Sequence, residues 1–351
     1  KGAFFELAIP VLDTLELSAA GRYEDYGGSI GDSFDYKLAA LFQPIDMLSI
    51  RASYGTAFIA PTLEQLFEPE DCGLQTADDP VSGDREQTFR VACISGNSAL
   101  TPEEAEVYNL GFTVSLLDGD LTLGVDYSSY DFEDRVADTS MNQVLTLDYQ
   151  NFLAAGLTAG AFSGNGTTGD ALAWAADPRS NKDIIRDPGT GLISRVKTSR
   201  INAQKMEVAS WDFYGRYNIS WNEWGDFAIG WEATKAEKYD YDLGFGITGE
   251  GVGEQNEDVI EVPPVPEWRM TGTLSWFMGN HRANIRARYI DEFDLEFNSA
   301  GLAGGQQAFH GTMTADSIVY TDLTYAYTFD ELIGDRSTTI EVGGRNIFDE
   351  F

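Results

Sequence analysis

The segment at residues 48–54 alternates between apolar and polar side chains. The apolar or aromatic positions are Leu48, Ile50, Ala52 and Tyr54. The positions between them are polar and include Arg51. A period of two predicts a β-strand whose two faces meet different surroundings. Because a charged arginine is costly in a dry protein core, we expect the face that carries Arg51 to be in contact with water.

The same alternation recurs in about twelve segments, most of them about 9 to 13 residues long. Strands of globular proteins usually have about 5 or 6 residues, whereas a tilted strand that crosses a bilayer needs about 9 to 11. The connections alternate in length. Turns are expected near residues 10–14, 43–47, 116–120, 222–226, 278–280 and 329–337. Long loops are expected near residues 58–104, 132–195, 240–266 and 291–313.

Short turns at one end of the strands and long loops at the other are typical of outer-membrane β-barrels. The predicted fold is therefore all-β, a transmembrane antiparallel up-and-down β-barrel. In such a barrel every backbone group within the hydrocarbon is paired, the apolar face contacts lipid, and the polar face lines the lumen. The alternative is a soluble β-protein with one solvated face, but the length of the strands favours the barrel.

Charged side chains within the alternating segments share the polar positions, so we expect them to face the lumen. These residues are Arg22, Arg51, Asp126, Asp212, Arg216, Arg286, Arg288, Asp322, Glu341 and Arg345. We expect the arginines to pair with carboxylates of this set. Aromatic residues fall near the ends of the apolar faces, where barrels carry girdles of aromatics at the two membrane interfaces.

Composition adds limits rather than a function. The 351 residues include 57 acidic and 23 basic side chains, for a net charge of −34. A chain with this charge is not expected to bind nucleic acid. The sequence contains no run of 18 apolar residues, so it predicts no transmembrane helix. The first residues lack the pattern of a signal peptide, and we expect the segment to belong to a longer chain.

The two cysteines, Cys72 and Cys93, lie 21 positions apart in one polar stretch. An even pair at this spacing favours a disulfide in an oxidising compartment, and two unrelated thiols are the alternative. With only His281 and His310 present, a metal cage or a catalytic triad has few residues to draw on. We therefore predict no enzymatic activity and no metal site.

Clustered carboxylates occur in the expected loops, for example in the stretches "EPEDCGLQTADDP" and "YDYDLG". Oxygen ligands of this kind suit calcium, although the spacing does not match an EF-hand loop. Solvated acidic loops are the simpler interpretation, and no other cofactor is expected. Acidic loops at the outer opening of the barrel favour neutral or cationic cargo, whereas the arginines expected in the lumen favour anionic cargo.

Several sequence motifs resemble those of the TonB-dependent receptors of Gram-negative outer membranes. The stretch "RASYGTAFIAPTLEQLF" at residues 51–67 is similar to a strand and loop start of that family, with Ile59 where an arginine is usual. "SGNSALTPEEAEVYNLGF" at residues 95–112 resembles its Gly-Asn-Pro-x-Leu-x-Pro-Glu stretch, with Ser98 in place of the proline. "VGGRNIFDE" at residues 342–350 resembles the Arg-Asn-Leu-Phe-Asp motif of its penultimate strand, and residues 186–217 resemble a large subgroup.

The resemblance implies a 22-stranded barrel, with a plug that couples to the TonB complex of the inner membrane. It implies active uptake of a scarce nutrient such as a siderophore, an oligosaccharide or a peptide. The alternative is a passive outer-membrane channel or a structural surface barrel. The implied surroundings are outer-membrane lipid and lipopolysaccharide. No ligand-binding residue and no individual ligand follow from the motifs.

Residues 1–351 are then expected to form a partial barrel domain, without the plug, the early strands and the final strand. About twelve strands counted back from the penultimate one would be the tenth to the twenty-first. We therefore predict an open curved sheet. A hydrogen-bonded ladder between residues 3–9 and 339–347 would instead indicate a closed barrel of twelve strands.

Overall fold

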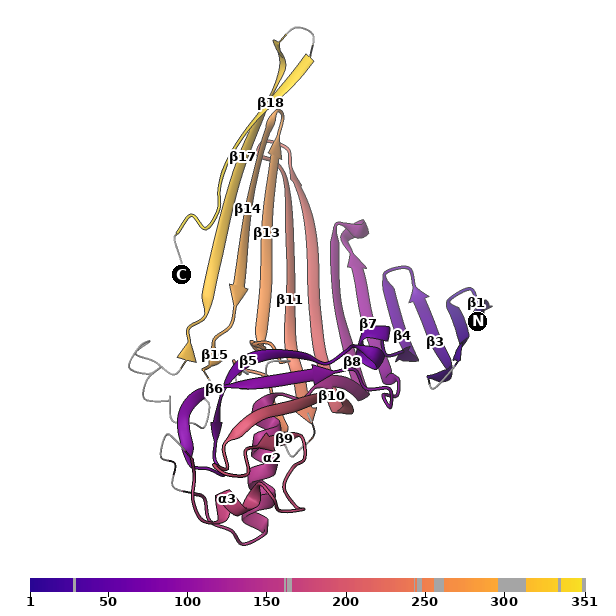
Figure 1. The fold of residues 1–351 in the computed structure, drawn as a ribbon. Helices are drawn as coiled ribbons and strands as arrows, with labels where there is room; N and C mark the ends of the chain where they lie inside the picture. The colour runs from indigo at the N-terminus through magenta and orange to yellow at the C-terminus, as the bar shows by residue number, and fades with distance from the viewer. Residues whose placement is uncertain are drawn as a thin grey trace.

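The protein forms one long antiparallel sheet of twelve strands in sequence order (Figure 1). The structure, a computed structural model, describes residues 1–27, 30–160, 162, 166–242, 244, 248–255, 262–295, 314–333 and 336–348. The strands of this wall are β1 (Gly2–Leu12), β2 (Leu15–Gly27), β3 (Gly31–Ile45), β4 (Leu48–Ile59), β7 (Glu103–Leu116), β8 (Leu121–Asp138), β10 (Ile193–Trp221), β11 (Gly225–Asp242), β13 (Trp268–Met278), β14 (His281–Ile290), β17 (Ile318–Ile333) and β18 (Arg336–Gly344).

The wall is open, as predicted from the sequence. Among the described residues β1 pairs only with β2, and β18 pairs only with β17, so no ladder joins the two edge strands. Every other strand of the wall has a neighbour on both sides. The described residues contain no helix with the length and hydropathy of a membrane span.

Two girdles of aromatic side chains mark a band across the apolar face of the wall. At one level Tyr127 packs on Trp211, with ring centroids 4.9 Å apart. At the other level Trp221 packs on Phe227, at 5.8 Å. Trp211 and Trp221 are ten positions apart on β10. At about 3.3 Å per residue they lie roughly 33 Å apart along the strand, or about 25 Å along the membrane normal at the usual tilt. This height matches the apolar band of an outer-membrane barrel.

The first two long loops predicted from the sequence, 58–104 and 132–195, are not irregular but fold together into one compact unit, the cap. It consists of α1 (Leu63–Phe67), β5 (Asp71–Asp79), β6 (Asp84–Ser95), α2 (Met141–Ala154), α3 (Asp170–Trp174), β9 (Ile184–Arg186) and residues 193–199 of β10. Parallel pairing of β10 with β6 joins the two loops. In Figure 1 the cap lies at the end of the wall opposite the β17–β18 turn.

The cap has its own hydrophobic core, which explains why two acidic loops fold. The capping box of Ser140 and Gln143 begins α2, whose Val144 and Leu145 pack against Ala77, Ala92 and Val196 of the cap sheet. Phe152 and Trp174 meet edge to face beneath it, and both are fully buried. The cap therefore has a rigid interior, whereas most of the wall is a single layer.

Several short elements complete the described structure. A 3-10 turn, η1 (Leu117–Gly119), joins β7 to β8. β12 (Thr248–Glu250) pairs with β11, and β15 (Phe293–Asp294) pairs with β16 (Thr314–Ala315). The expected loop at 240–266 therefore contains a short strand. Most of the expected loop at 291–313, from residue 296 onward, lies outside the described residues.

Candidate functional site

The strand register gathers the charged residues predicted from the sequence on one face of the wall. One row of opposed residues runs from Arg51 through Gly111 and Asp126 to Asp212. Another runs from Arg216 through Gly230, Thr273 and Arg286 to Asp322. Arg22, Arg288 and Glu341 fall on the same face by alternation, and Arg345 lies in the bend after β18. We call this the polar face.

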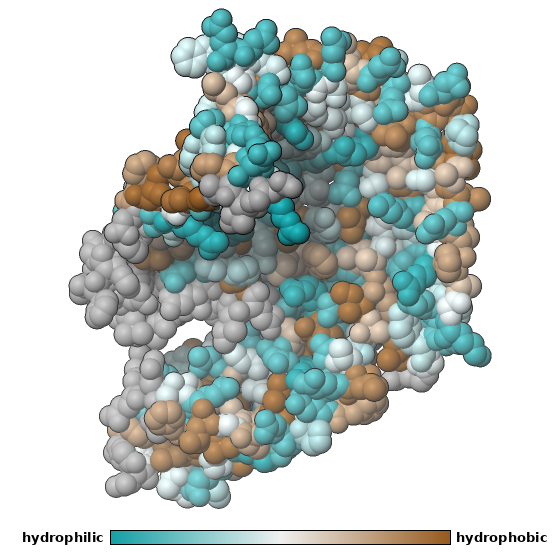
Figure 2. All heavy atoms as spheres, turned by 90° about the horizontal axis from the view of Figure 1, so that it is seen from above, coloured by the Kyte–Doolittle hydropathy of each residue, from teal (hydrophilic) through white to brown (hydrophobic). Residues whose placement is uncertain are grey.

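The polar face is hollowed around Arg51. A depression of about 480 Å³ is lined there by Glu16, Lys37, Ser53, Asn109, Ser128 and Asp212, among others. Figure 2 looks along the strands and shows hydrophilic side chains gathered around the hollow that the curved wall encloses. The described part of the wall is thus amphipathic, with aromatic girdles on one face and this polar hollow on the other.

Arg51 is the centre of a hydrogen-bond network that joins four strands. Its guanidinium forms an ion pair with Asp126, donates to the hydroxyl of Tyr214 at 2.9 Å, and donates to the hydroxyl of Thr113 at 3.2 Å. Tyr214 and Thr113 are themselves 2.8 Å apart, oxygen to oxygen. Arg51 and Asp126 were both predicted from the sequence to lie on the polar face. Tyr214 was not predicted as a residue of this network, although it occupies a polar-face position in the alternation of its strand.

Gly111 makes this network possible. It lies between Arg51 and Asp126 in the row of opposed residues. A Cβ at this position would overlap a carboxylate oxygen of Asp126 and would lie 2.7 Å from Nε of Arg51. The side chains of the two neighbouring strands can therefore meet across β7 only because β7 presents a glycine there.

Some of the other charged residues predicted to face the lumen form ion pairs, some form only hydrogen bonds, and some form neither with a described residue. Arg288 forms an ion pair with Asp322 at 3.3 Å, and Arg22 with Glu24 at 2.5 Å. Glu341 pairs with Arg282, which was not among the predicted lumen residues although it occupies a polar position of the same alternating segment as Arg286. Arg216 donates to Asn218, and Asp212 accepts from Thr234. The described residues provide no ion pair for Arg216, Arg286 or Arg345.

A second group of charges lies buried in the cap, and no local sequence pattern indicates it. Arg186 forms ion pairs with Asp79 at 2.5 Å and with Asp148 at 3.2 Å, and all three side chains are at most 2% exposed. Asp148 also accepts hydrogen bonds from the indole of Trp174 and from the backbone of Asn181. Burial acts to lower the pKa of Arg186, but the two carboxylates outweigh it and the pKa is raised.

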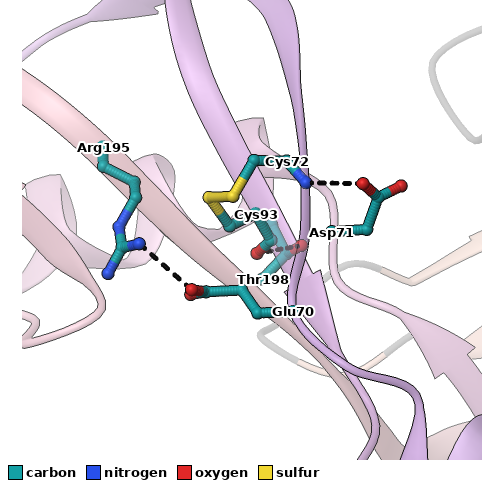
Figure 3. The surroundings of a disulfide bond; sticks show 6 residues. All are labelled: Glu70, Asp71, Cys72, Cys93, Arg195 and Thr198. Atoms are coloured by element: carbon teal, nitrogen blue, oxygen red, sulfur yellow. Dashed lines mark hydrogen bonds and ion pairs between the residues drawn. A yellow bond between two sulfur atoms is a disulfide. The ribbon is translucent and has the colours of Figure 1, made fainter.

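The predicted Cys72–Cys93 disulfide is present (Figure 3). It joins directly opposed residues of the β5–β6 hairpin, and their Cα atoms are 4.0 Å apart. Cys93 is 1% exposed, whereas Cys72 lies at the surface. Beside the bridge, Arg195 of β10 pairs with Glu70 at 3.1 Å, and Thr198 donates to the carbonyl oxygen of Cys93.

The motif residues at 62–67 and 95–102 meet at the junction of the cap and the wall. The backbone N–H of Asn97 bonds to the carbonyl of Gln65 in α1, and its side chain donates to the carbonyl of Arg200. Arg200 pairs with Glu68 and with Asp138 at the end of β8. The pKa of Arg200, which burial acts to lower, is raised by these carboxylates. These motifs are therefore structural and fix the cap on the wall.

Among the described residues no three carboxylate, histidine or cysteine side chains are arranged as ligands of one metal ion. His281 contacts Tyr325 and Tyr327 on the apolar face, and His310 lies outside the described residues.

A family profile described as "TonB dependent receptor-like, beta-barrel" matches residues 1–347. Among solved structures, a mutant ferric enterobactin receptor of Pseudomonas aeruginosa is 14% identical, with a TM-score of 0.61 over 99% of this chain and 39% of that one. The siderophore receptor PirA of Acinetobacter baumannii is 13% identical, with a TM-score of 0.58 over 99% of this chain and 41% of that one. The iron transporter FrpB of Neisseria meningitidis is 13% identical, with a TM-score of 0.53 over 99% and 40%.

The chain thus spans about two fifths of the length of these structures. At this level of identity the likeness concerns the fold. A comparison with curated protein sequences found no match.

Proposed function

Because the chain belongs to the TonB-dependent receptor β-barrel family, whose members are outer-membrane proteins, we propose that it is the wall of an active nutrient transporter. The transporter takes up a scarce compound with energy from the TonB system of the inner membrane. The observation that carries this proposal is the family match over residues 1–347, and the aromatic girdles, the open twelve-stranded wall and the polar hollow support it.

In this proposal the polar face lines the lumen and the apolar face contacts outer-membrane lipid. Arg51, Asp126 and the other charges of the polar face then meet water and the surface of a plug domain. The plug and its TonB-binding box would come from parts of the protein outside these 351 residues, as would the remaining strands of a barrel with 22 of them. Lipopolysaccharide would surround the outer aromatic girdle.

In this proposal the cap lies at the outer mouth of the barrel and is the part that cargo meets first. Its core and its buried Arg186 network keep one surface in place above the mouth of the barrel. The siderophore receptors named above are similar to this chain in fold, and a siderophore is one candidate cargo beside an oligosaccharide or a peptide. No catalytic role is proposed.

The experiment uses the full-length protein in its own host and in planar bilayers. A plugged active transporter gives no large steady conductance, and purified TonB binds it. Growth on the limiting nutrient is lost when tonB is deleted. A steady ohmic pore that does not bind TonB, with growth unaffected by the deletion, would favour the alternative of a passive channel. Mass spectrometry of compounds that copurify with the protein would identify the cargo.

A further inference from the structure

The polar face changes character at its outer end. Outward from the row of Asp126 and Asp212, the same face of β8, β10 and β11 carries apolar and aromatic side chains. Tyr130 lies opposite Val208, which lies opposite Tyr239, and in the next row Phe132 lies opposite Met206. We call the five residues Tyr130, Phe132, Met206, Val208 and Tyr239 the mouth cluster.

The mouth cluster lies outside the membrane band, so lipid does not account for it. The rings of Tyr130 and Phe132 are nearly parallel, at 9°, with centroids 6.1 Å apart. Both rings are partly exposed, as is Tyr239, whereas Met206 is 6% exposed. Tyr239 packs against the buried pair of Tyr241 and Val262. The cluster thus presents aromatic surface to water at the mouth of the wall, in a form suited to a flat ring.

Arg135 at the edge of the cluster has an unusual environment. Its Nη1 donates to the sulfur of Met206 at 3.5 Å, and the described part of the chain offers it no ion pair. Among the described residues, a half-buried arginine that forms no ion pair is an exception in a chain with a net charge of −34. Burial raises the pKa of Tyr239, and the positive charge of Arg135 acts in the opposite direction. A planar guanidinium in such a site suits a carboxylate.

Gln204 supplies a second unsatisfied group. The register places it directly opposite Arg135, between two irregularities of the β8–β10 ladder. Its side chain is 2% exposed, and its Oε1 is buried with no hydrogen-bond partner among the described residues. A buried amide oxygen without a donor destabilises the fold, because its hydrogen bonds to water are lost and not replaced. A bound hydroxyl or N–H group would satisfy this oxygen.

We propose that the mouth cluster, Arg135 and Gln204 bind a ring that carries one carboxylate and a neighbouring hydroxyl. The ring lies on the aromatic surface, the carboxylate accepts from Arg135, and the hydroxyl donates to Oε1 of Gln204. One arginine balances one negative charge, and the acidic surroundings disfavour ligands that carry several negative charges. This assignment rests on the proposed uptake function and names the class of cargo.

This chemistry has two sources, an acidic sugar and an aromatic carboxylic acid. The full-length protein in detergent is titrated with methyl galacturonoside and with 4-hydroxybenzoate, and binding is measured by calorimetry and saturation-transfer NMR. Methyl galactoside and phenol are the neutral counterparts. We expect one of the two acids to bind and its neutral counterpart to bind about 30-fold or more weakly, because the buried charge pair is lost.

Variants separate a binding role from a structural one. Arg135→Gln should lower the affinity for the acidic probe about 30-fold or more and leave the affinity for the neutral probe unchanged, and Arg135→Lys should lose less. Gln204→Leu should weaken binding while raising the unfolding temperature, since it removes an unpaired buried amide. Arg179→Gln, a change at an exposed arginine of the cap, is the matched control and should bind as the wild type does.

The proposal fails if the wild type binds neither acid at millimolar concentration, if the neutral probes bind as tightly as the acids, or if Arg135→Gln leaves binding unchanged. These outcomes concern binding alone. Loss of TonB dependence in cells would instead overturn the transport function, so the two failures can be told apart.

Discussion

Gly111 lies at a point in the wall where a single methyl group would separate two charges. We predict that Gly111→Ala lowers the free energy of unfolding by about 1–3 kcal/mol, because Asp126 and Arg51 must move apart in a tightly packed place. Urea titration of the full-length protein in micelles, followed by tryptophan fluorescence, measures this change in the free energy of unfolding. Gly272→Ala in β13 is the control, since a Cβ there meets nothing within 4 Å. Equal midpoints for the two variants would contradict the prediction.

Arg186 lies between two carboxylates that have no access to water. Replacement by leucine leaves Asp79 and Asp148 buried without their cation, so we predict a loss of about 3–5 kcal/mol in the stability of the cap. Hydrogen exchange of cap peptides, with the wall peptides as internal reference, measures this loss. Arg179→Leu removes an exposed arginine paired with Asp177 and should leave the stability of the cap nearly unchanged. A cap that exchanges equally slowly in both variants would refute the argument.

At the scale of elements, the disulfide links two strands that already pair along most of their length. Its removal in the double variant Cys72→Ala, Cys93→Ala should therefore loosen the β5–β6 hairpin by at most about 3 kcal/mol and leave the wall unchanged. Faster hydrogen exchange confined to residues 71–95 is the expected result. Reduction and alkylation of the wild type should reproduce it. Loss of the folded wall would show that the bridge does more than hold this hairpin.

The sequence predicts the wall well and the cap poorly, for a physical reason. A period of two is a local signal, so the faces of Arg51 and Asp126 could be assigned strand by strand. Pairing of β6 with β10 joins residues about a hundred positions apart, and no local pattern indicates it. Likewise Asp79, Asp148 and Arg186 look like solvated loop charges until three distant segments bring them together. The residues expected in the lumen and the division into domains stay predictions.

At the scale of the whole molecule, the two faces of the wall predict opposite responses to the same substitution. Ile229 lies on the apolar face of β11, and its neighbour Ala228 lies on the polar face. We predict that Ile229→Arg destabilises the barrel in bilayers by about 2–4 kcal/mol, because lipid solvates the charge poorly. Ala228→Arg should have little effect beside Asn218 and Ser275. Folding into vesicles at a series of urea concentrations measures both.

The reverse order of stability would mean that the faces are exchanged, because a shift of one residue in register inverts every side chain of a strand. Equal and small effects would indicate that the band between the two girdles is not in contact with hydrocarbon.

β10 runs unbroken for 29 residues, from the lower aromatic girdle to the cap sheet. Because the outer end of β10 pairs with β6, the two loops that form the cap, 58–104 and 132–195, cannot be inherited or exchanged separately. A chimera that takes residues 59–103 from a relative but keeps residues 138–199 would leave β6 without a matching strand. Recombination between relatives, in nature or in the laboratory, should therefore preserve both segments together, and the cap should diversify as a single unit.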